Sequence, residues 1–351
     1  MNPKFRQLTF AREYRGLTQT ELASRIPGLS QSNLSKFEKG LQTLSDELLT
    51  RILNHLNFPL SFLEIAISNG EESSHYRKKA TIPMKERARI SRENKLIGYI
   101  IDCMSDEISY PEYRLPAIDI EYGYTPQAVA SHVRKLFHLG DYPISEPMRL
   151  IESMGIIIAE APAQYQDFDG VSIITDKGNR VIIINKYMSN DRKRFTLAHE
   201  LGHIIMHHGF LIPDYRDIEK EANEFASEFL MPSEVIRPSL RNLRFPSLPI
   251  LKQYWLCSMA AIIKRAKDLA AITPEKAQYL MIELSRRGYR KNEPVEIPID
   301  RPVLMMQAFR MFTTTLGYTP QQMAQTFHLP TDVIDYFFKD PDKMRFRIKA
   351  V

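Results

Sequence analysis

Two histidines and one glutamate near the middle of the chain have a spacing that could bind a metal ion. They lie in RFTLAHELGH, residues 194–203, where His199 and His203 are four residues apart. On a helix this spacing places the two side chains one turn apart on the same face. Two imidazoles so placed can bind one Zn²⁺, and Glu200 beside them can act as a base toward a water on the metal. Apolar residues surround the polar ones, which predicts that this helix is largely buried.

A third metal ligand is expected from a second helix, EKEANEFASEFL at residues 219–230. Its alanines and phenylalanines form an apolar stripe at helical spacing. Glu219 and Asn223 fall on or beside that stripe. We therefore expect Glu219, and not Glu221, to complete a site for one zinc ion per chain, with Asn223 hydrogen-bonded to a ligand imidazole. The other glutamates of this helix are expected to point away from the stripe (Glu221, Glu224 and Glu228).

Two other interpretations of the histidine pair are weaker. A buried helix could use both histidines only to satisfy hydrogen bonds, but Glu200 and Glu219 argue against this. The variant with a third histidine six residues after the second does not fit, since position 206 is Met and position 209 is Gly. His207 and His208 are expected to be structural or to lie at the rim of the site.

Three segments together resemble the ImmA/IrrE family of zinc metallopeptidases. These are RFTLAHELGHIIMHH, EKEANEFASEFLMP and the preceding DGVSIITDKGNRVIIIN. The resemblance extends from about Thr125 to Asp300 and implies a gluzincin-like site, with His199, His203 and Glu219 as ligands and Glu200 as catalytic base. Known members are site-specific endopeptidases that cut a partner repressor, relieving repression of phage, mobile-element or stress genes.

Short strands and helices must position this site. Isoleucine- and valine-rich runs predict strands at 156–158, 171–174 and 181–184, the last two joined by a hairpin turn at 176–179. This hairpin could pair with an extended substrate or be plain core. The oxyanion partner stays open among Tyr187, Tyr215 and His207. Helices are predicted at 125–139, 145–154, 233–243, 250–271 and 274–287.

The first 66 residues predict five short helices. Thr18 and Glu21 form the capping-box pattern at the start of the second helix, and Ser30 is placed to cap the third. Gly40 suits the left-handed position that ends it. A tight turn between the second and third helices indicates a helix-turn-helix domain. The helices are expected at 5–14, 19–26, 31–39, 46–56 and 59–66.

This segment resembles the XRE, or phage-repressor-like, family through LTQTELA and SQSNLSKFEKG in residues 17–40. Pro27 departs from the family pattern by lengthening the turn by one residue. The resemblance implies a third helix in the major groove of double-stranded DNA, and a homodimer on paired half-sites for useful affinity. A protein-interaction domain of the same fold is the alternative. The implied base contacts are Gln31, Ser32, Asn33 and Lys36, and the implied phosphate contacts are Gln19 and Lys39.

The expected fold class is mostly α with a small β-sheet: a five-helix, lambda-repressor-like domain, a zincin-like (gluzincin) domain and a helical C-terminal region. The expected boundaries are 1–66, a linker and bridging helix at 67–124, the peptidase domain at 125–300, and an extension at 301–351. The bridging helix, over 83–108, begins with a basic run that is a solvated face or a DNA-backbone contact. Residues 319–338 could form a second helix-turn-helix, which without exposed basic residues indicates a docking or packing module.

Composition is ordinary for a globular protein, with 44% apolar and 25% charged residues. Lysine and arginine exceed the acids by only 47 to 42, so DNA binding must depend on a local patch. Cys103 and Cys257 are isolated and indicate reduced thiols in a cytoplasmic protein. No apolar run has the length of a membrane span, and no signal-peptide core is evident.

The sequence therefore favours a DNA-binding zinc endopeptidase and transcriptional regulator that cleaves a partner repressor. The rival is a non-catalytic XRE-type regulator or antitoxin in which the zinc fold is a sensor or scaffold. Intact Glu200 argues against the rival, because a scaffold has no chemical need for a base.

Overall fold

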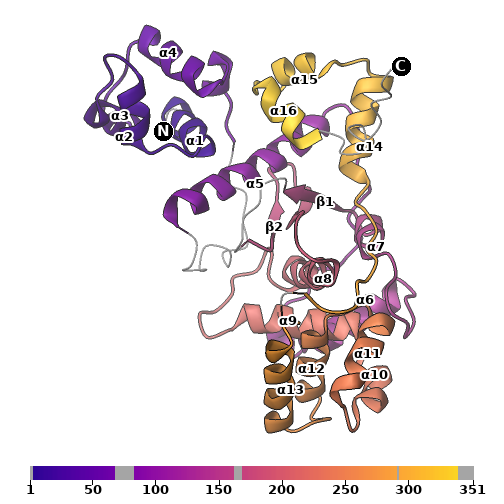
Figure 1. Ribbon diagram of the computed structural model, residues 1–351. Helices are drawn as coiled ribbons and strands as arrows, with labels where there is room; N and C mark the ends of the chain where they lie inside the picture. The colour runs from indigo at the N-terminus through magenta and orange to yellow at the C-terminus, as the bar shows by residue number, and fades with distance from the viewer. Residues whose placement is uncertain (1–2, 68–82, 162–167, 291, 339–351) are drawn as a thin grey trace, which may run out of the picture.

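The computed structural model describes residues 3–67, 83–161, 168–290 and 292–338 (Figure 1). Within these residues the chain forms sixteen α-helices and one three-stranded sheet, which confirms the expected fold class. No helix among the described residues is both long and apolar enough to cross a membrane.

The N-terminal helices form at the places where caps and apolar spacing predict them. The Thr18 hydroxyl accepts from the Glu21 amide while the Glu21 carboxylate accepts from the Thr18 amide, closing the capping box. Gly40 has a φ of 72°, the left-handed conformation expected after the third helix. The fifth element is a single 3₁₀ turn, shorter than predicted. The elements are α1 (Pro3–Tyr14), α2 (Gln19–Arg25), α3 (Gln31–Glu38), α4 (Asp46–Leu56) and η1 (Leu60–Leu63).

The sheet has the order β1-β3-β2, with β1 parallel and β2 antiparallel to β3. The antiparallel pair is the predicted hairpin, and each strand is longer than expected by one to three residues. Alternate side chains of a strand point to opposite faces, so each face of the sheet has its own apolar core. The α5 helix covers one face and α8 the other (Figure 1). The elements are β1 (Ile156–Ala161), β2 (Gly170–Ile174), β3 (Arg180–Asn185), α5 (Met84–Met104) and α8 (Asn190–Met206).

The α9 helix packs closely along α8. Gly202 makes this possible, because a Cβ atom at that position would lie 3.0 Å from Cδ1 of Phe225. Contacts of His203 with Glu219 and of His199 with Asn223 show that the two helices run antiparallel. The remaining helices before the strands are α6 and α7, and α6 packs on α9. Their bounds are α6 (Pro126–Leu136), α7 (Pro147–Ser153) and α9 (Ile218–Leu230), with the short η3 (Ile120–Tyr122) ahead of them.

The long helix predicted at 250–271 is wrong in one respect, because the structure divides it in two. Leu256 adopts a left-handed conformation with a φ of 56°, and Ser258 caps a new helix through the Ala261 amide. Local apolar spacing continues through this break, so the pattern did not reveal it. The elements here are α10 (Ser233–Leu240), η4 (Phe245–Ser247), α11 (Leu248–Trp255), α12 (Met259–Asp268) and α13 (Pro274–Arg286).

The C-terminal helices share one apolar core with the N-terminal helices and part of α5. At its edge the Asp332 carboxylate accepts from the Arg15 guanidinium at 2.7 Å and from the Asn57 amide at 2.7 Å. The predicted second helix-turn-helix at 319–338 is thus packed against other parts of the chain. Its elements, with those before it, are α14 (Leu304–Arg310), the π-helical turn η5 (Met311–Thr315), α15 (Pro320–Thr326) and α16 (Thr331–Phe338).

Candidate metal centre and DNA-binding face

The side chains of two histidines of α8 and one glutamate of α9 lie close together between the two helices. The Nε2 atoms of His199 and His203 are 3.0 Å apart, and they lie 3.5 Å and 3.4 Å from the carboxylate oxygens of Glu219. One ligand atom from each of the three residues falls within 4.8 Å of the other two. Two imidazole nitrogens and a carboxylate oxygen are a donor set that zinc takes in hydrolytic sites, so these residues fit such an ion.

The charges at this cluster suit a cation. Burial raises the pKa of Glu219, but the neighbouring imidazoles of His199 and His203 outweigh it and hold the pKa well below its usual range. Burial lowers the pKa of His203 to about 3, which keeps this imidazole neutral. An ionised carboxylate and a neutral imidazole are the protonation states that metal ligands need.

Glu200 lies directly beside the cluster in a dry environment. It is 5% exposed, and burial raises its pKa. One carboxylate oxygen, Oε2, is buried without a hydrogen-bond partner among the described residues. Ser172 on β2 lowers this pKa, but burial outweighs it. A buried oxygen without a partner is costly, and a water bound at the cluster would supply the missing donor.

Both imidazoles of the cluster are held through their Nδ1 atoms. The Oδ1 atom of Asn223 lies 3.2 Å from Nδ1 of His199, one turn along α9 from Glu219. On the other side, Nδ1 of His203 lies 2.8 Å from Nδ1 of His207. Hydrogen bonds at Nδ1 orient the rings with Nε2 toward the cluster. His207 is therefore a structural support, one of the two roles expected for it.

The sequence led us to expect that Glu221 points away from the apolar stripe of α9, and this prediction is wrong. Its Oε2 atom lies 2.9 Å from Nε2 of His207, and Arg216 donates to both carboxylate oxygens at 2.7 and 3.0 Å. The correction arises because the loop before α9 brings Arg216 and His207 to that side of the helix. Arg216 also lies 3.4 Å from Asp119, so the chain of contacts continues to a distant segment. The four-residue spacing of His203 and His207 could have indicated the contact between them. No sequence pattern indicated the contact of Arg216 with Glu221.

Glu228 is a second correction on the same helix. It is 5% exposed and forms an ion pair with Arg265 of α12. It also accepts from the Ser233 amide at 2.9 Å, at the start of α10. The helices α10 and α12 cover this part of α9, so an outward-facing position in the helix becomes an interior one.

Three residues were open as oxyanion partners. Both ring nitrogens of His207 are engaged, by His203 and by Glu221. The Tyr215 hydroxyl donates to Glu121 at 2.9 Å, and its side chain is 78% exposed. Tyr187 is also exposed, and among the described residues its hydroxyl has no hydrogen-bond partner.

Four of the predicted DNA contacts belong to α3, Lys39 is its C-terminal cap, and Gln19 is the first residue of α2. Gln31, Ser32, Lys36 and Lys39 are exposed, and Asn33 is half-buried. The Gln31 side-chain amide donates to Oε1 of Gln19 at 2.9 Å, and Gln19 in turn donates to Glu38 at 2.7 Å. Arg12 fixes Glu38 through two hydrogen bonds. Gln19 and Gln31 are thus presented together and in a set orientation, which sequence spacing alone did not indicate.

Comparisons with known proteins agree with this architecture. Residues 151–267 match a peptidase family model described as the IrrE N-terminal-like domain, and residues 10–63 match one described as helix-turn-helix. A stretch of 69 residues is 35% identical to a protein of Bacillus phage phi105 described as uncharacterized immunity region protein 2. The match covers 17% of this chain and 44% of the phage protein, so the chain spans less than half of that relative. Both resemblances seen in the sequence are confirmed at the level of these two segments.

Proposed function

We propose that this chain, which joins a helix-turn-helix segment to an IrrE N-terminal-like domain, is a DNA-binding zinc endopeptidase and transcriptional regulator that cleaves a partner repressor. The observation that carries the proposal is the cluster of His199, His203 and Glu219 beside the buried, partnerless oxygen of Glu200. A scaffold would gain nothing from that oxygen, since an unsatisfied buried carboxylate is destabilising.

His199, His203 and Glu219 would hold one zinc ion per chain, and Asn223 and His207 would keep the two rings turned toward it. When bound, zinc supplies Lewis acidity toward a water and a peptide carbonyl. Glu200 accepts the proton of the attacking water at Oε2, and its raised pKa makes it able to pass that proton on to the leaving amine. The hairpin strand β2, next to α8, is the candidate partner for an extended substrate.

The N-terminal segment would bind the DNA that the protein regulates. We propose that α3 enters the major groove of double-stranded DNA, with Gln31, Ser32, Asn33 and Lys36 toward the bases. Gln19 and Lys39 would contact phosphates. A homodimer on paired half-sites would provide the affinity that one small domain lacks. The proposed domain boundaries are those drawn from the sequence, and the proposed location is the cytoplasm.

A repressor is the proposed substrate for two reasons. The helix-turn-helix segment would bring the peptidase to operator DNA, where repressors are concentrated. The phage relative is described as an uncharacterized immunity region protein, which we take as support for a target among phage genes. Cleavage of a repressor would then release phage, mobile-element or stress genes.

The variant Glu200→Gln tests this function because it keeps the side-chain volume but removes the base. Expressed beside candidate repressors, the variant should retain zinc and DNA binding, yet cut the repressor on the order of 10²–10⁴ times more slowly. Repressor fragments and promoter activity are the two measurements. Glu234→Gln, an exposed glutamate of α10, is the matched control. Equal behaviour of Glu200→Gln and wild type in both measurements would favour the non-catalytic regulator or antitoxin.

A further inference from the structure

Within the described part of the chain, one edge of β2 pairs with no other strand. The strand lies at the end of the sheet and pairs with β3 only. On that inner side the Thr175 amide donates to the Asn179 carbonyl at 2.9 Å. Hydrogen-bonded pairs alternate along an antiparallel ladder, so the backbone groups of Gly170, Ser172 and Ile174 point outward. Among the described residues no backbone hydrogen bond reaches this outer edge.

The α8 helix packs directly on β2. A Cβ atom at Gly170 would lie 2.6 Å from Cγ2 of Thr196. Further along the strand, Oγ of Ser172 lies 3.2 Å from Nε2 of His208, just after the end of α8. Glu200 is one helical turn after Thr196 and belongs to the same side of α8. A peptide paired with the outer edge of β2 would therefore run past the proposed base.

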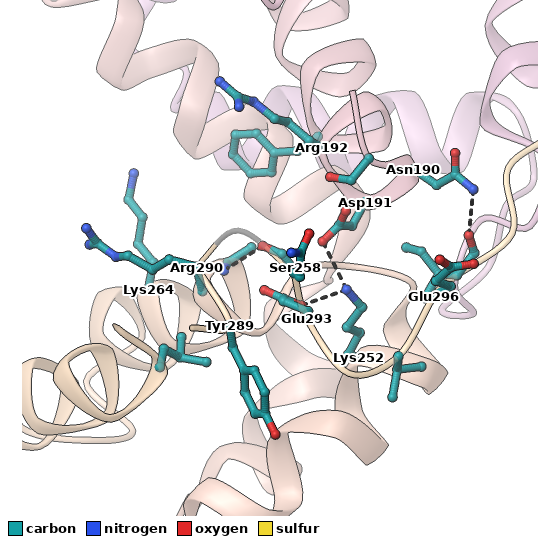
Figure 2. A pocket seen from close by; sticks show the side chains of 18 of the residues that line it. Asn190, Asp191, Arg192, Lys252, Ser258, Lys264, Tyr289, Arg290, Glu293 and Glu296 are labelled. Carbon is teal, nitrogen blue, oxygen red and sulfur yellow. Dashed lines mark hydrogen bonds and ion pairs between the residues drawn. The ribbon is translucent and has the colours of Figure 1, made fainter. Parts of the chain in front are cut away.

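The first turn of α8 is fixed by contacts of its own. The Asp191 carboxylate lies 3.0 Å from Nζ of Lys252, which is buried and also pairs with Glu293 at 2.6 Å (Figure 2). The Asn190 side-chain amide donates to the Ile297 carbonyl at 2.8 Å. These contacts join α8 to α11 and to the segment after α13, and none of them involves β2. The position of the strand relative to the base therefore depends on what else holds the strand.

The α5 helix covers the opposite face of β2. A Cβ atom at Gly98 would lie 3.1 Å from Cδ1 of Ile173 and 3.4 Å from Cγ2 of Thr175, so the helix and the strand are in close contact. One turn further along α5 comes Asp102, which is 6% exposed. A carboxylate so deeply buried needs hydrogen-bond donors to compensate for the loss of water.

The hairpin turn between β2 and β3 supplies these donors to Asp102. Thr175 donates from its hydroxyl at 2.6 Å, Asn179 from its side-chain amide at 2.8 Å, and Lys177 from its backbone amide at 3.1 Å. The Lys177 ammonium group also donates to the Asp102 carbonyl at 2.7 Å and pairs with Asp106. Apolar contacts alone would let the turn slide along the helix, whereas three directional hydrogen bonds to one carboxylate favour a single arrangement.

We propose that Asp102 is a positioning residue for substrate binding. By fixing the hairpin turn, it holds the outer edge of β2 beside Glu200, where an extended substrate pairs with the strand. The proposal rests on the proposed peptidase function and adds a residue on which substrate binding depends. Asp102 acts through the strand, so its loss should weaken substrate binding and leave proton transfer by Glu200 intact.

Binding without cleavage is the first test. Full-length, zinc-loaded Glu200→Gln is titrated with fluorescently labelled peptides from a partial digest of candidate repressors. Adding Asp102→Asn keeps the side-chain volume but turns one acceptor into a donor that faces the donors of the turn. It should weaken binding on the order of fivefold, and Thr175→Val, which removes one donor, should weaken it less. The control Glu107→Gln removes a nearby exposed carboxylate and should leave the affinity unchanged.

Kinetics and hydrogen exchange are the second test. With a repressor that wild type cleaves, Asp102→Asn should raise KM on the order of fivefold and change kcat by less than about twofold, at unchanged zinc content. Amide exchange at Val171 and Ile173, which pair with β3, should become faster on the order of tenfold. The amides of α8 should keep their wild-type exchange rates, because that helix has its own contacts.

The outcomes separate this proposal from the proposed function. Equal peptide affinities with and without Asp102→Asn, or a fall in kcat at unchanged KM, overturn the positioning role. No peptide binding to Glu200→Gln at all contradicts both proposals. Peptide binding that Asp102→Asn weakens, without any cleavage by wild type, contradicts the peptidase function alone.

Discussion

The Nδ1 atoms of His203 and His207 face each other at 2.8 Å, which assigns a proton to only one of them. His207 Nε2 faces the carboxylate of Glu221 at 2.9 Å and therefore carries a hydrogen. In a neutral His207 the Nδ1 atom is then an acceptor, so His203 donates from its own Nδ1. The lone pair of His203 is left on Nε2, the atom that faces Glu219. A helical neighbour thus selects the tautomer that a metal ligand requires.

Replacing His207 should therefore weaken zinc binding although His207 is not a proposed ligand. We expect His207→Ala to lower zinc affinity by about 10–100-fold, because His203 loses the acceptor that fixes its tautomer. Competition with a chromophoric chelator measures the affinity. His132→Ala removes an exposed histidine of α6 and serves as control. An affinity equal to wild type in both variants would show that the His203–His207 contact does not matter for the metal.

The choice between two glutamates can be tested by metal stoichiometry. Wild-type protein purified without chelator should contain about one zinc per chain, and His199→Ala with His203→Ala should contain none. Glu219→Ala should lose most of its metal. Glu221→Ala should still reach one zinc per chain at saturation, since it acts only through His207. Elemental analysis gives the ratios, and the reverse order of the two glutamate variants would show that Glu221 is the ligand.

The DNA-binding face makes a separate prediction. Substituting Gln31, Asn33 or Lys36 by Ala should each weaken specific DNA binding by about 1–3 kcal/mol. Gln19→Ala should also weaken it, because Gln19 holds the Gln31 amide. Fluorescence anisotropy with a site found by genome-wide immunoprecipitation measures the effect, and Gln253→Ala on α11 is the control. If no genomic site is enriched, the segment is better described as a protein-interaction domain.

Stability should depend on pH through Glu152. Burial raises the pKa of Glu152 to about 7, although the Val303 and Leu304 amides, which donate to its carboxyl group, lower it. A carboxyl group with a raised folded-state pKa stabilises fully below its unfolded pKa, and this contribution is lost as pH rises toward 7. The variant Glu152→Gln keeps a hydrogen-bond acceptor but has no titrating group. Its melting temperature should therefore rise relative to that of wild type between pH 5 and pH 8. Thermal melts of both proteins measure this at each pH. A difference in melting temperature that stayed constant from pH 5 to pH 8 would contradict the prediction.

Local sequence determined the parts of this protein that depend on neighbours along the chain. The capping box of Thr18 and Glu21 and the left-handed Gly40 follow from short-range hydrogen bonds and backbone preference. The spacing of His199 and His203 needs only a regular helix to put both on one face. For Glu219 and Asn223, the apolar stripe of α9 indicated which side faces α8. These features are fixed within one helix, so they were accessible without the fold.

The tertiary structure decided what depends on segments brought together from far apart. Glu221 and Glu228 look like outward positions of α9, yet Arg216 and Arg265 make them interior ion pairs. The predicted 250–271 helix is divided at Leu256, which adopts a left-handed conformation where the apolar periodicity shows no break. The contact of Arg15 with Asp332 joins residues 317 positions apart. Periodicity tells which side of a helix is apolar, but only the packed neighbours determine which charges are buried and paired.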